Sequence, residues 1–311
     1  MKIIIPILLI FTGFYSGSGL SLPKANDFLE QKINQLNIEN SLMDLEIEDP
    51  ELRSKADIII PWLRYSAHAV KTYYGKFPVE KYRLQLIAID GDSVTSGHAY
   101  GGSHPLIEVY IGKQITPENL KKDWVLVHEM IHLALAELPR RHHWLVEGLA
   151  VYIESVARVK AGQLQQDVVW KSFIKSMPKG LPQQGDKGLD FTPTWGRRYW
   201  GGALFCLLAD IQIRQDSNNQ FGLLDAMRGI LDAGYSMNRE SDIESLLKLG
   251  DQATGLTVLI DQYDQMKAQP VTTDLDQIWR SVGVSLLKGK IKYNDKALLA
   301  KARLNIFKPV K

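Results

Sequence analysis

The chain has 311 residues, of which 45% are hydrophobic and 23% are charged. This is an ordinary globular composition, and the length is sufficient for one large domain or two. The 37 Lys and Arg residues are balanced by 35 Asp and Glu residues, which leaves a formal net charge of +2. Because the basic residues form no stripe, nucleic acid is not expected as a partner.

The first 21 residues have the three regions of a secretory signal peptide. Lys2 precedes an apolar run over residues 3–15, and small residues follow at 16–21. This run is short for a membrane span, so we expect the signal to be cleaved, with an uncleaved anchor as the alternative. We therefore predict a secreted or periplasmic protein that has no stable membrane span after cleavage. The only cysteine, Cys206, cannot form an intramolecular disulfide, so the exported chain would rely on its core.

The segments that follow predict helices and a small sheet. Their periodicity and glycine content predict a helix over 24–49, a helix over 57–74, a strand over 82–90, a glycine-rich loop over 91–103 and a strand over 106–111. We expect residues 22–116 to form an N-terminal subdomain of helices and a small mixed β-sheet.

The pattern His-Glu-Met-Ile-His at residues 128–132 is the most informative one in the chain. A Thr-Pro helix start at 116–117 and a stop at Pro139 predict that it lies on one buried helix of about 20 residues. Positions i and i+4 share a helix face, so His128 and His132 could bind one zinc ion. Glu129, beside them, could take a proton from a metal-bound water. The alternative is a pair of buried histidines that form hydrogen bonds in the core.

A catalytic zinc ion needs a third protein ligand and an open position for water. After a short basic turn, a second apolar helix carries Glu147 in its first turn. A carboxylate in such a stretch should be paired or bind metal, and the adjacent Gly148 indicates the close approach of another group. His142 and His143 in the turn are rival ligands. The alternative for Glu147 is an ordinary first-turn acid, favoured by the helix dipole.

The sequence HEMIH followed by WLVEGLA resembles the gluzincin metallopeptidases, the thermolysin-like superfamily. The closest resemblance is to their aminopeptidase branch, which includes the glycyl aminopeptidase-like proteins. It implies that His128, His132 and Glu147 are the zinc ligands and that Glu129 is the general base. The connector of fourteen residues between His132 and Glu147 is shorter than is common in that branch.

Two further segments carry the resemblance, which extends over residues 57–283. Residues 74–78 are similar to a Tyr-Gly-x-Phe-Pro segment of those proteins, and residues 199–205 are similar to their tyrosine-plus-glycine element. The resemblance implies that Tyr199 is catalytic and donates a hydrogen bond to the oxyanion of the tetrahedral intermediate. A packing role at a helix start is the alternative for Tyr199.

The chain departs from the aminopeptidases at the substrate strand. They carry a Gly-x-Met-Glu-Asn segment whose Glu holds the free amine of the substrate, whereas the segment here over residues 100–111 has no Glu among its glycines. We take Gly101, Gly102 and Glu108 as the substrate-binding candidates. The strand itself could pair with an extended peptide through main-chain hydrogen bonds.

Nearly every segment after residue 111 is predicted to be helical. Beyond the two motif helices we expect helices over 168–176, 197–216, 221–233, 241–250, 254–267 and 272–282, a Pro- and Gly-rich loop over 177–196, and a hairpin over 284–293. We therefore predict an α+β fold. A zinc-binding helical catalytic subdomain would cover 117–283, a C-terminal tail would cover 284–311, and the zinc cleft would lie between the sheet and the helices.

These observations predict a zinc-dependent peptidase with one Zn²⁺ ion, a peptide or protein as substrate and an exported, aminopeptidase-like activity. The alternative is a catalytically inactive binding or scaffold protein of the cell envelope that retains the zinc site.

Overall fold

The computed structural model describes residues 34–309. The predicted signal peptide and the first ten residues of the helix predicted over 24–49 lie outside the described residues. Within 34–309, no helix is both long enough and apolar enough to cross a membrane.

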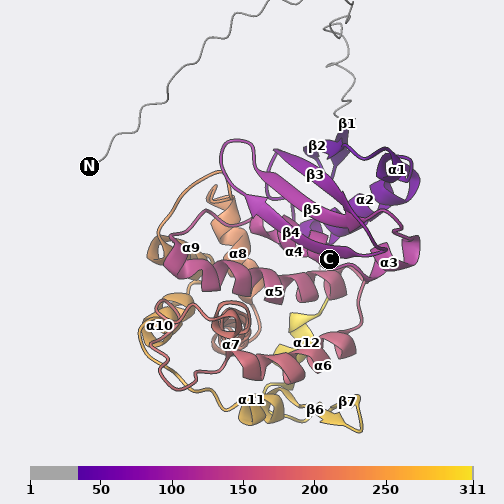
Figure 1. Ribbon diagram of the computed structural model, residues 1–311. Coiled ribbons are helices and arrows are strands. Elements are labelled where there is room, and N and C mark those ends of the chain that lie inside the picture. Colours follow the sequence, from indigo (N-terminus) through magenta and orange to yellow (C-terminus); the bar gives the residue numbers. More distant parts are fainter. Residues whose placement is uncertain (1–33, 310–311) are drawn as a thin grey trace, which may run out of the picture. The chain divides into compact units, whose positions relative to one another are not determined.

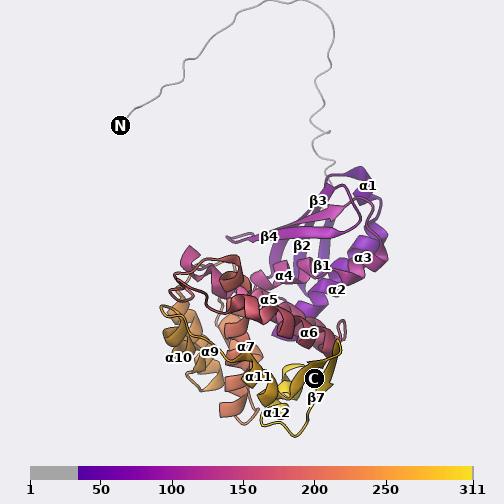
Figure 2. The same ribbon diagram turned by 60° about the horizontal axis from the view of Figure 1, so that its bottom comes forward.

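A five-stranded mixed sheet occupies one side of the described chain (Figure 1). Its strands lie in the order β1 (Asn34–Ile38), β2 (Ser41–Ile47), β3 (Lys81–Ile89), β5 (Leu106–Gly112) and β4 (Val94–Tyr100). The β2–β3 and β3–β5 pairs are parallel, and the β1–β2 and β4–β5 pairs are antiparallel. β4 is therefore an edge strand, and Figure 2 shows it on the side of the sheet that faces the helices.

Two segments of the sheet differ from the prediction. The described part of the segment predicted as a helix over 24–49 forms β1 and β2, which are joined by a two-residue turn with positive φ at Glu39 and Asn40. The predicted loop over 91–103 contains β4. Only one bulky apolar residue, Val94, lies in its first five positions, so this edge strand has no apolar alternation that would identify it. The strands predicted over 82–90 and 106–111 are confirmed as β3 and β5.

The helices packed against the sheet are α1 (Pro50–Arg53), α2 (Ala56–Tyr74), α3 (Pro117–Lys122) and α4 (Val125–His132). The prediction of α2 is confirmed, but the single helix predicted from residue 117 to Pro139 is wrong. Asp123 has an extended backbone, and its carboxylate accepts hydrogen bonds from the amides of Val125 (2.9 Å) and Leu126 (3.2 Å). Asp123 thus ends α3 and caps the start of α4.

The rest of the described chain is mainly helical, as predicted. It contains the 3₁₀ turns η1 (Arg140–His142) and η2 (Met177–Gly180), the π-helical turn η3 (Arg197–Gly201), and the helices α5 (His143–Lys160), α6 (Gln166–Ser176), α7 (Gly202–Asp216), α8 (Leu223–Asp232), α9 (Ile243–Thr254), α10 (Val258–Met266) and α11 (Leu275–Val282). The predicted hairpin is β6 (Val284–Leu287) with β7 (Lys290–Tyr293), and the predicted tail also contains α12 (Ala300–Ile306).

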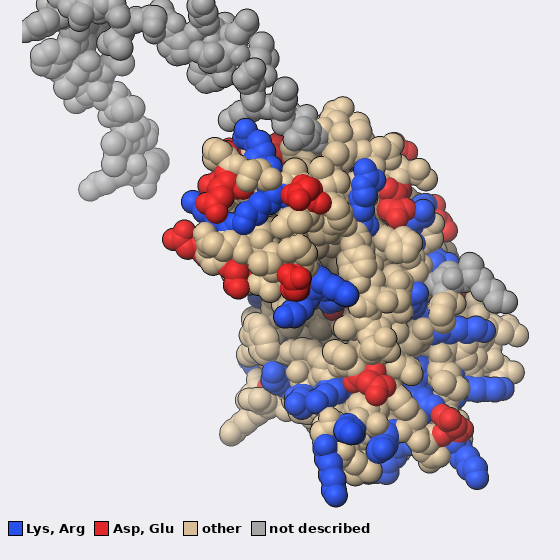
Figure 3. All heavy atoms as spheres, turned by 90° about the vertical axis from the view of Figure 1, so that its right-hand side faces the viewer, with Lys and Arg blue, Asp and Glu red and all other residues tan. Residues whose placement is uncertain are grey.

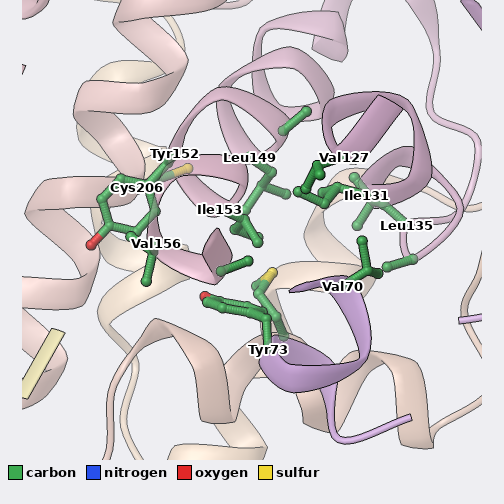
Figure 4. Packing of buried hydrophobic residues seen from close by; sticks show 14 of the residues in the cluster. Val70, Tyr73, Val127, Ile131, Leu135, Leu149, Tyr152, Ile153, Val156 and Cys206 are labelled. Carbon is green, nitrogen blue, oxygen red and sulfur yellow. The ribbon is translucent and has the colours of Figure 1, made fainter. Parts of the chain in front are cut away.

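A continuous hydrophobic core joins the sheet side to the helical side (Figure 4). Side chains from α2, α4, α5 and α7 meet in it, including Tyr73, Ile131, Ile153 and Cys206. All eight residues of α4 are buried, because this helix lies between β4 on one side and α5 and α2 on the other. The sequence motif therefore lies at the centre of the described structure, where polar groups are costly to bury unless they are paired.

Candidate active site

Two imidazoles from α4 and one carboxylate from α5 converge on one point. His128 and His132 share a face of α4, with ring centroids 4.9 Å apart. Glu147 points at this pair from α5. Its Oε2 atom lies 3.3 Å from Nε2 of His128 and 3.7 Å from Nε2 of His132. Glu147 is the fifth residue of α5, so it lies in the second turn and not in the first turn that was predicted.

The three groups fit a zinc ion. Ligand atoms at 2.0–2.1 Å from a tetrahedral zinc are separated by about 3.3 Å, close to the two separations found here. A ligand histidine must be neutral, and burial lowers the pKa of His132 to about 3. Burial alone would raise the pKa of Glu147, but its hydrogen bond with His128 and the nearby imidazoles outweigh that effect and lower the pKa. Glu147 is thus ionised, as a ligand carboxylate must be.

Glu129 lies next to this group but in a different environment. Its carboxylate is within 4.8 Å of ring nitrogens of His128 and His132, and its Oε2 is 4.0 Å from His132 Nε2. Glu147 is nearer to His132, which makes Glu147 the better ligand candidate. Burial raises the pKa of Glu129 to about 7, and the charge of Glu147 contributes. A carboxyl group with a pKa near neutrality is suited both to accept and to return a proton.

Tyr199 reaches the site from the π-helical turn η3, which leads into α7. Turns of this kind inside helices are frequent at functional sites. The tyrosine is half-buried and lines the cleft beside His128 and Glu129. Burial, and then the charge of Glu147, raises the pKa of Tyr199. Its hydroxyl therefore stays protonated and can act as a hydrogen-bond donor.

Two glycine contacts hold this arrangement together. A Cβ atom on Gly148 would lie 2.2 Å from the carbonyl carbon of Gly202, and one on Gly202 would lie 1.9 Å from the carbonyl oxygen of Trp144. α5 and the start of α7 thus cross in direct backbone contact, which brings Tyr199 close to Glu147. The close approach predicted at Gly148 is present, and the approaching group is another glycine.

Gly97 on the edge strand makes a third close contact, which the sequence analysis did not identify. A Cβ atom there would lie 2.5 Å from Cγ of Glu129. Because Gly97 has no side chain, β4 can lie directly over the Glu129 side chain. In the sequence, Gly97 lies between Ser96 and His98, in a segment without apolar alternation. Nothing in this pattern indicated that Gly97 belongs to the site.

The rival histidines of the basic turn have other positions. His142 is fully buried, and its Nδ1 atom lies 3.0 Å from Oδ1 of Asp190. Asp190 also accepts hydrogen bonds from Trp144 (2.8 Å) and Tyr263 (2.8 Å). This network attaches the loop before η3 to the start of α5. His143 is exposed and lines the cleft, outside the group formed by His128, His132 and Glu147.

The three substrate-binding candidates fall in different places. Gly101 lines the cleft, and its backbone lies against the carboxylate of Glu137. Gly102 donates a backbone hydrogen bond to Met237 (3.2 Å) and is not among the cleft residues. Glu108 is also absent from the cleft. It alternates with the buried Ile107 and Val109, so its side chain is on the opposite face of the sheet, where it accepts a hydrogen bond from Tyr100 (3.2 Å).

The cleft consists of two cavities that meet beside the edge strand β4, where both are lined by Gly97, His128, Glu129 and Tyr199. The larger cavity has a volume of about 1030 Å³ and extends from there between α3, α5, α6 and η2. The smaller one, about 550 Å³, extends along β4 to Gly101 and Glu137. An extended chain could therefore lie across the site with room on both sides.

The fold is similar to that of the crystal structure of an aminopeptidase N family protein from Idiomarina loihiensis. The TM-score is 0.60 at 12% sequence identity, and the match covers 81% of this chain and 49% of that one. An M1 zinc metallopeptidase from Deinococcus radiodurans has a TM-score of 0.44 at 14% identity, with 77% of this chain and 51% of that one covered. This chain thus spans about half the length of each. No protein-family model and no curated protein matches the sequence. The likeness to the Idiomarina protein shows that the chain has the α+β fold of this aminopeptidase N family protein, in agreement with the fold that the sequence resemblance implied.

Proposed function

We propose that this protein is a zinc-dependent peptidase, aminopeptidase-like and exported from the cell. The observation that carries the proposal is the convergence of His128, His132 and Glu147 on one point in an open cleft, with Glu129 beside them. Two buried histidines that merely hydrogen-bond in a core would not need a third, ionised ligand candidate, nor would they face a cavity.

In this proposal, His128, His132 and Glu147 hold the zinc ion. When bound, zinc acts as a Lewis acid that polarises the scissile carbonyl and makes a water molecule more acidic. Glu129 takes the proton of the attacking water and later returns it to the leaving amine. Tyr199 donates a hydrogen bond to the oxyanion that develops on the carbonyl oxygen. The exposed edge of β4 pairs with the main chain of the substrate and orients the scissile bond.

A Glu129→Gln variant tests this proposal. The amide has nearly the same shape as the carboxylate but cannot accept a proton, so we expect peptide cleavage to fall by about 10²–10⁴-fold. Cleavage is measured by mass spectrometry of a peptide mixture, with and without chelator, and metal content by elemental analysis. The matched control is Glu51→Gln on α1, an exposed residue outside the cleft.

The two alternatives predict different results. A peptidase loses cleavage in the Glu129→Gln variant, retains its metal and remains active in the Glu51→Gln control. An inactive binding or scaffold protein of the cell envelope shows no chelator-sensitive cleavage even in the unaltered chain, and that result would refute the proposal.

Export is the part of the proposal that depends on residues 1–21. Cell fractionation and N-terminal sequencing of the mature protein test it directly. We expect the protein outside the cytoplasm, with an N-terminus near residue 22. Recovery with an intact N-terminus in the membrane fraction would favour the uncleaved anchor.

A further inference from the structure

The larger cavity carries an excess of positive charge. Lys121 and Lys122 come from α3, and Lys179 comes from η2, so the lysines reach the cavity from elements far apart in the sequence. None of the ion pairs found within residues 34–309 includes any of them. Figure 3 views this side of the molecule and shows a hollow with Lys and Arg side chains at its edge.

The other charged groups of this cavity do not cancel the lysines. Arg158 and Glu154 are both buried and neutralise each other through a contact of 2.6 Å between Nη1 and Oε1. Within residues 34–309, Glu118 is the only other acid that lines the cavity apart from the central Glu129. Three lysines thus face one carboxylate, and long exposed lysines can move to meet a negative group that enters.

Exposed tryptophans lie among these lysines. Trp124, before α4, is 52% exposed, and Trp195, before η3, is 59% exposed. The Lys179 ammonium lies 5.8 Å from the centroid of the Trp195 ring. Large exposed aromatic rings in a cavity provide apolar contact area for a bound chain, and the lysines between them provide the charge.

The smaller cavity has the opposite character. Among the described residues that line it there is no lysine or arginine, and the acids are Glu137, Glu129 and Glu147. Cations therefore line one end of the cleft and carboxylates line the other, with Glu129 between them. A peptide that spans the cleft meets two different electrostatic environments.

The edge strand relates the two cavities to the direction of the substrate. The larger cavity borders residues 95–97 at the start of β4, and the smaller one borders residues 97–101 at its end. An extended peptide that adds to β4 in the more common antiparallel sense has its N-terminal residues beside the end of β4. Residues that follow the scissile bond then lie beside the start of β4, in the larger cavity.

We infer that this peptidase prefers substrates that carry negative charge after the scissile bond, as Asp or Glu side chains or as the C-terminal carboxylate of a short peptide, held by Lys121, Lys122 and Lys179. The inference rests on the proposed function and adds a substrate class to it. The exposed lysines act through solvent-screened contacts, so the preference is moderate and depends on salt.

The test compares three synthetic peptides with amidated C-termini that are identical except for one residue. One has Glu two residues after the scissile bond, and one has Glu as the residue immediately before it. The third is neutral and has Gln at both of these positions. At low ionic strength we expect kcat/KM for the peptide with Glu after the bond to exceed that of the neutral peptide by about three- to tenfold, and the advantage to shrink in 0.5 M salt. The peptide with Glu before the bond should show no advantage.

Charge reversal of the lysines provides a second, independent measurement. In a Lys121→Glu, Lys122→Glu, Lys179→Glu variant, we compare kcat/KM for the peptide with Glu after the bond with kcat/KM for the neutral peptide. The ratio of the first value to the second should fall to one or below. The matched control reverses three exposed lysines on the C-terminal hairpin, Lys288, Lys290 and Lys292, which line neither cavity. Its ratio should equal that of the unaltered protein.

The outcomes separate the inference from the proposed function. Equal kcat/KM for all three peptides, or an advantage of Glu before the bond, refutes the inference and leaves the peptidase activity intact. An unchanged ratio in the charge-reversal variant refutes the role of the lysines. Absence of chelator-sensitive cleavage of every peptide refutes the proposed function and the inference with it.

Discussion

The centre of the cleft and its two ends are built in different ways. At the centre, His128, Glu129 and His132 are buried on α4, and glycines on β4, α5 and α7 let the neighbouring elements pack closely around the site. At the ends, lysine, tryptophan and glutamate side chains project from helix ends and loops into open space. A closely packed centre suits chemistry in which the reacting groups must be held in place. Open ends lined by exposed side chains suit the binding of peptides that differ in sequence.

The largest expected effect comes from removing a ligand candidate at the centre. In a Glu147→Gln variant the neutral amide is a much poorer ligand than the carboxylate. We therefore expect zinc content to fall from about one ion per chain to a small fraction of that, with cleavage reduced to background. Elemental analysis after gel filtration measures the zinc content.

The matched control for this change is Glu137→Gln, which alters an exposed carboxylate in the smaller cavity. Its zinc content should be unchanged. If Glu147→Gln retained a full complement of zinc, Glu147 would not be a ligand, and the contrast between centre and ends would lose its main support.

A smaller effect is expected when only the oxyanion donor is removed. Tyr199→Phe keeps the ring in place but deletes the hydroxyl, so kcat should fall by about 10²–10³-fold while zinc content and KM change little. Steady-state kinetics on one peptide separates kcat from KM. A variant with kcat within threefold of the unaltered protein would return Tyr199 to a packing role.

The chemistry of the centre could be predicted because its signals are local. The spacing of His128 and His132 places both rings on one helix face, and Glu147 is an acid in an apolar helical stretch. Gly148 indicated a close approach because glycine is costly inside a helix. The break between α3 and α4 also had a local signal, since Asp123 lies just before an apolar run and its carboxylate accepts a hydrogen bond from the first amide of α4.

The parts that could not be predicted depend on contacts between distant segments. β4 has few bulky apolar residues, and it becomes a strand only because β5 provides a partner across a five-residue connection. The distance between Gly97 and Glu129 is likewise a property of the packed sheet and helix, and nothing near Gly97 in the sequence indicates it. Glu108 was placed on the correct strand, but the face to which it points follows from the register with β3 and β4.

The smallest effect among the changes at the centre is expected at Gly97, where the unpredicted contact can be tested. A Gly97→Ala substitution adds a methyl group 2.5 Å from Cγ of Glu129 and 3.1 Å from the carbonyl oxygen of Glu108. The Glu129 side chain can turn aside, but the backbone of β5 cannot. We expect a loss of about 1–3 kcal/mol of folding stability from overpacking, and about a ten- to hundredfold loss of kcat because the proton acceptor is displaced.

Thermal or urea denaturation and steady-state kinetics measure the two losses at Gly97 separately. Zinc content should remain at the level of the unaltered chain, because the three atoms nearest to the added methyl group belong to Glu129 and Glu108 and not to a ligand candidate. A stability loss without a loss of kcat would mean that Glu129 tolerates displacement, and therefore that the centre of the cleft is less tightly constrained than its packing indicates. A loss of kcat of about tenfold or more, with zinc content retained, would confirm that the edge strand is part of the catalytic centre and not only a surface for binding the substrate.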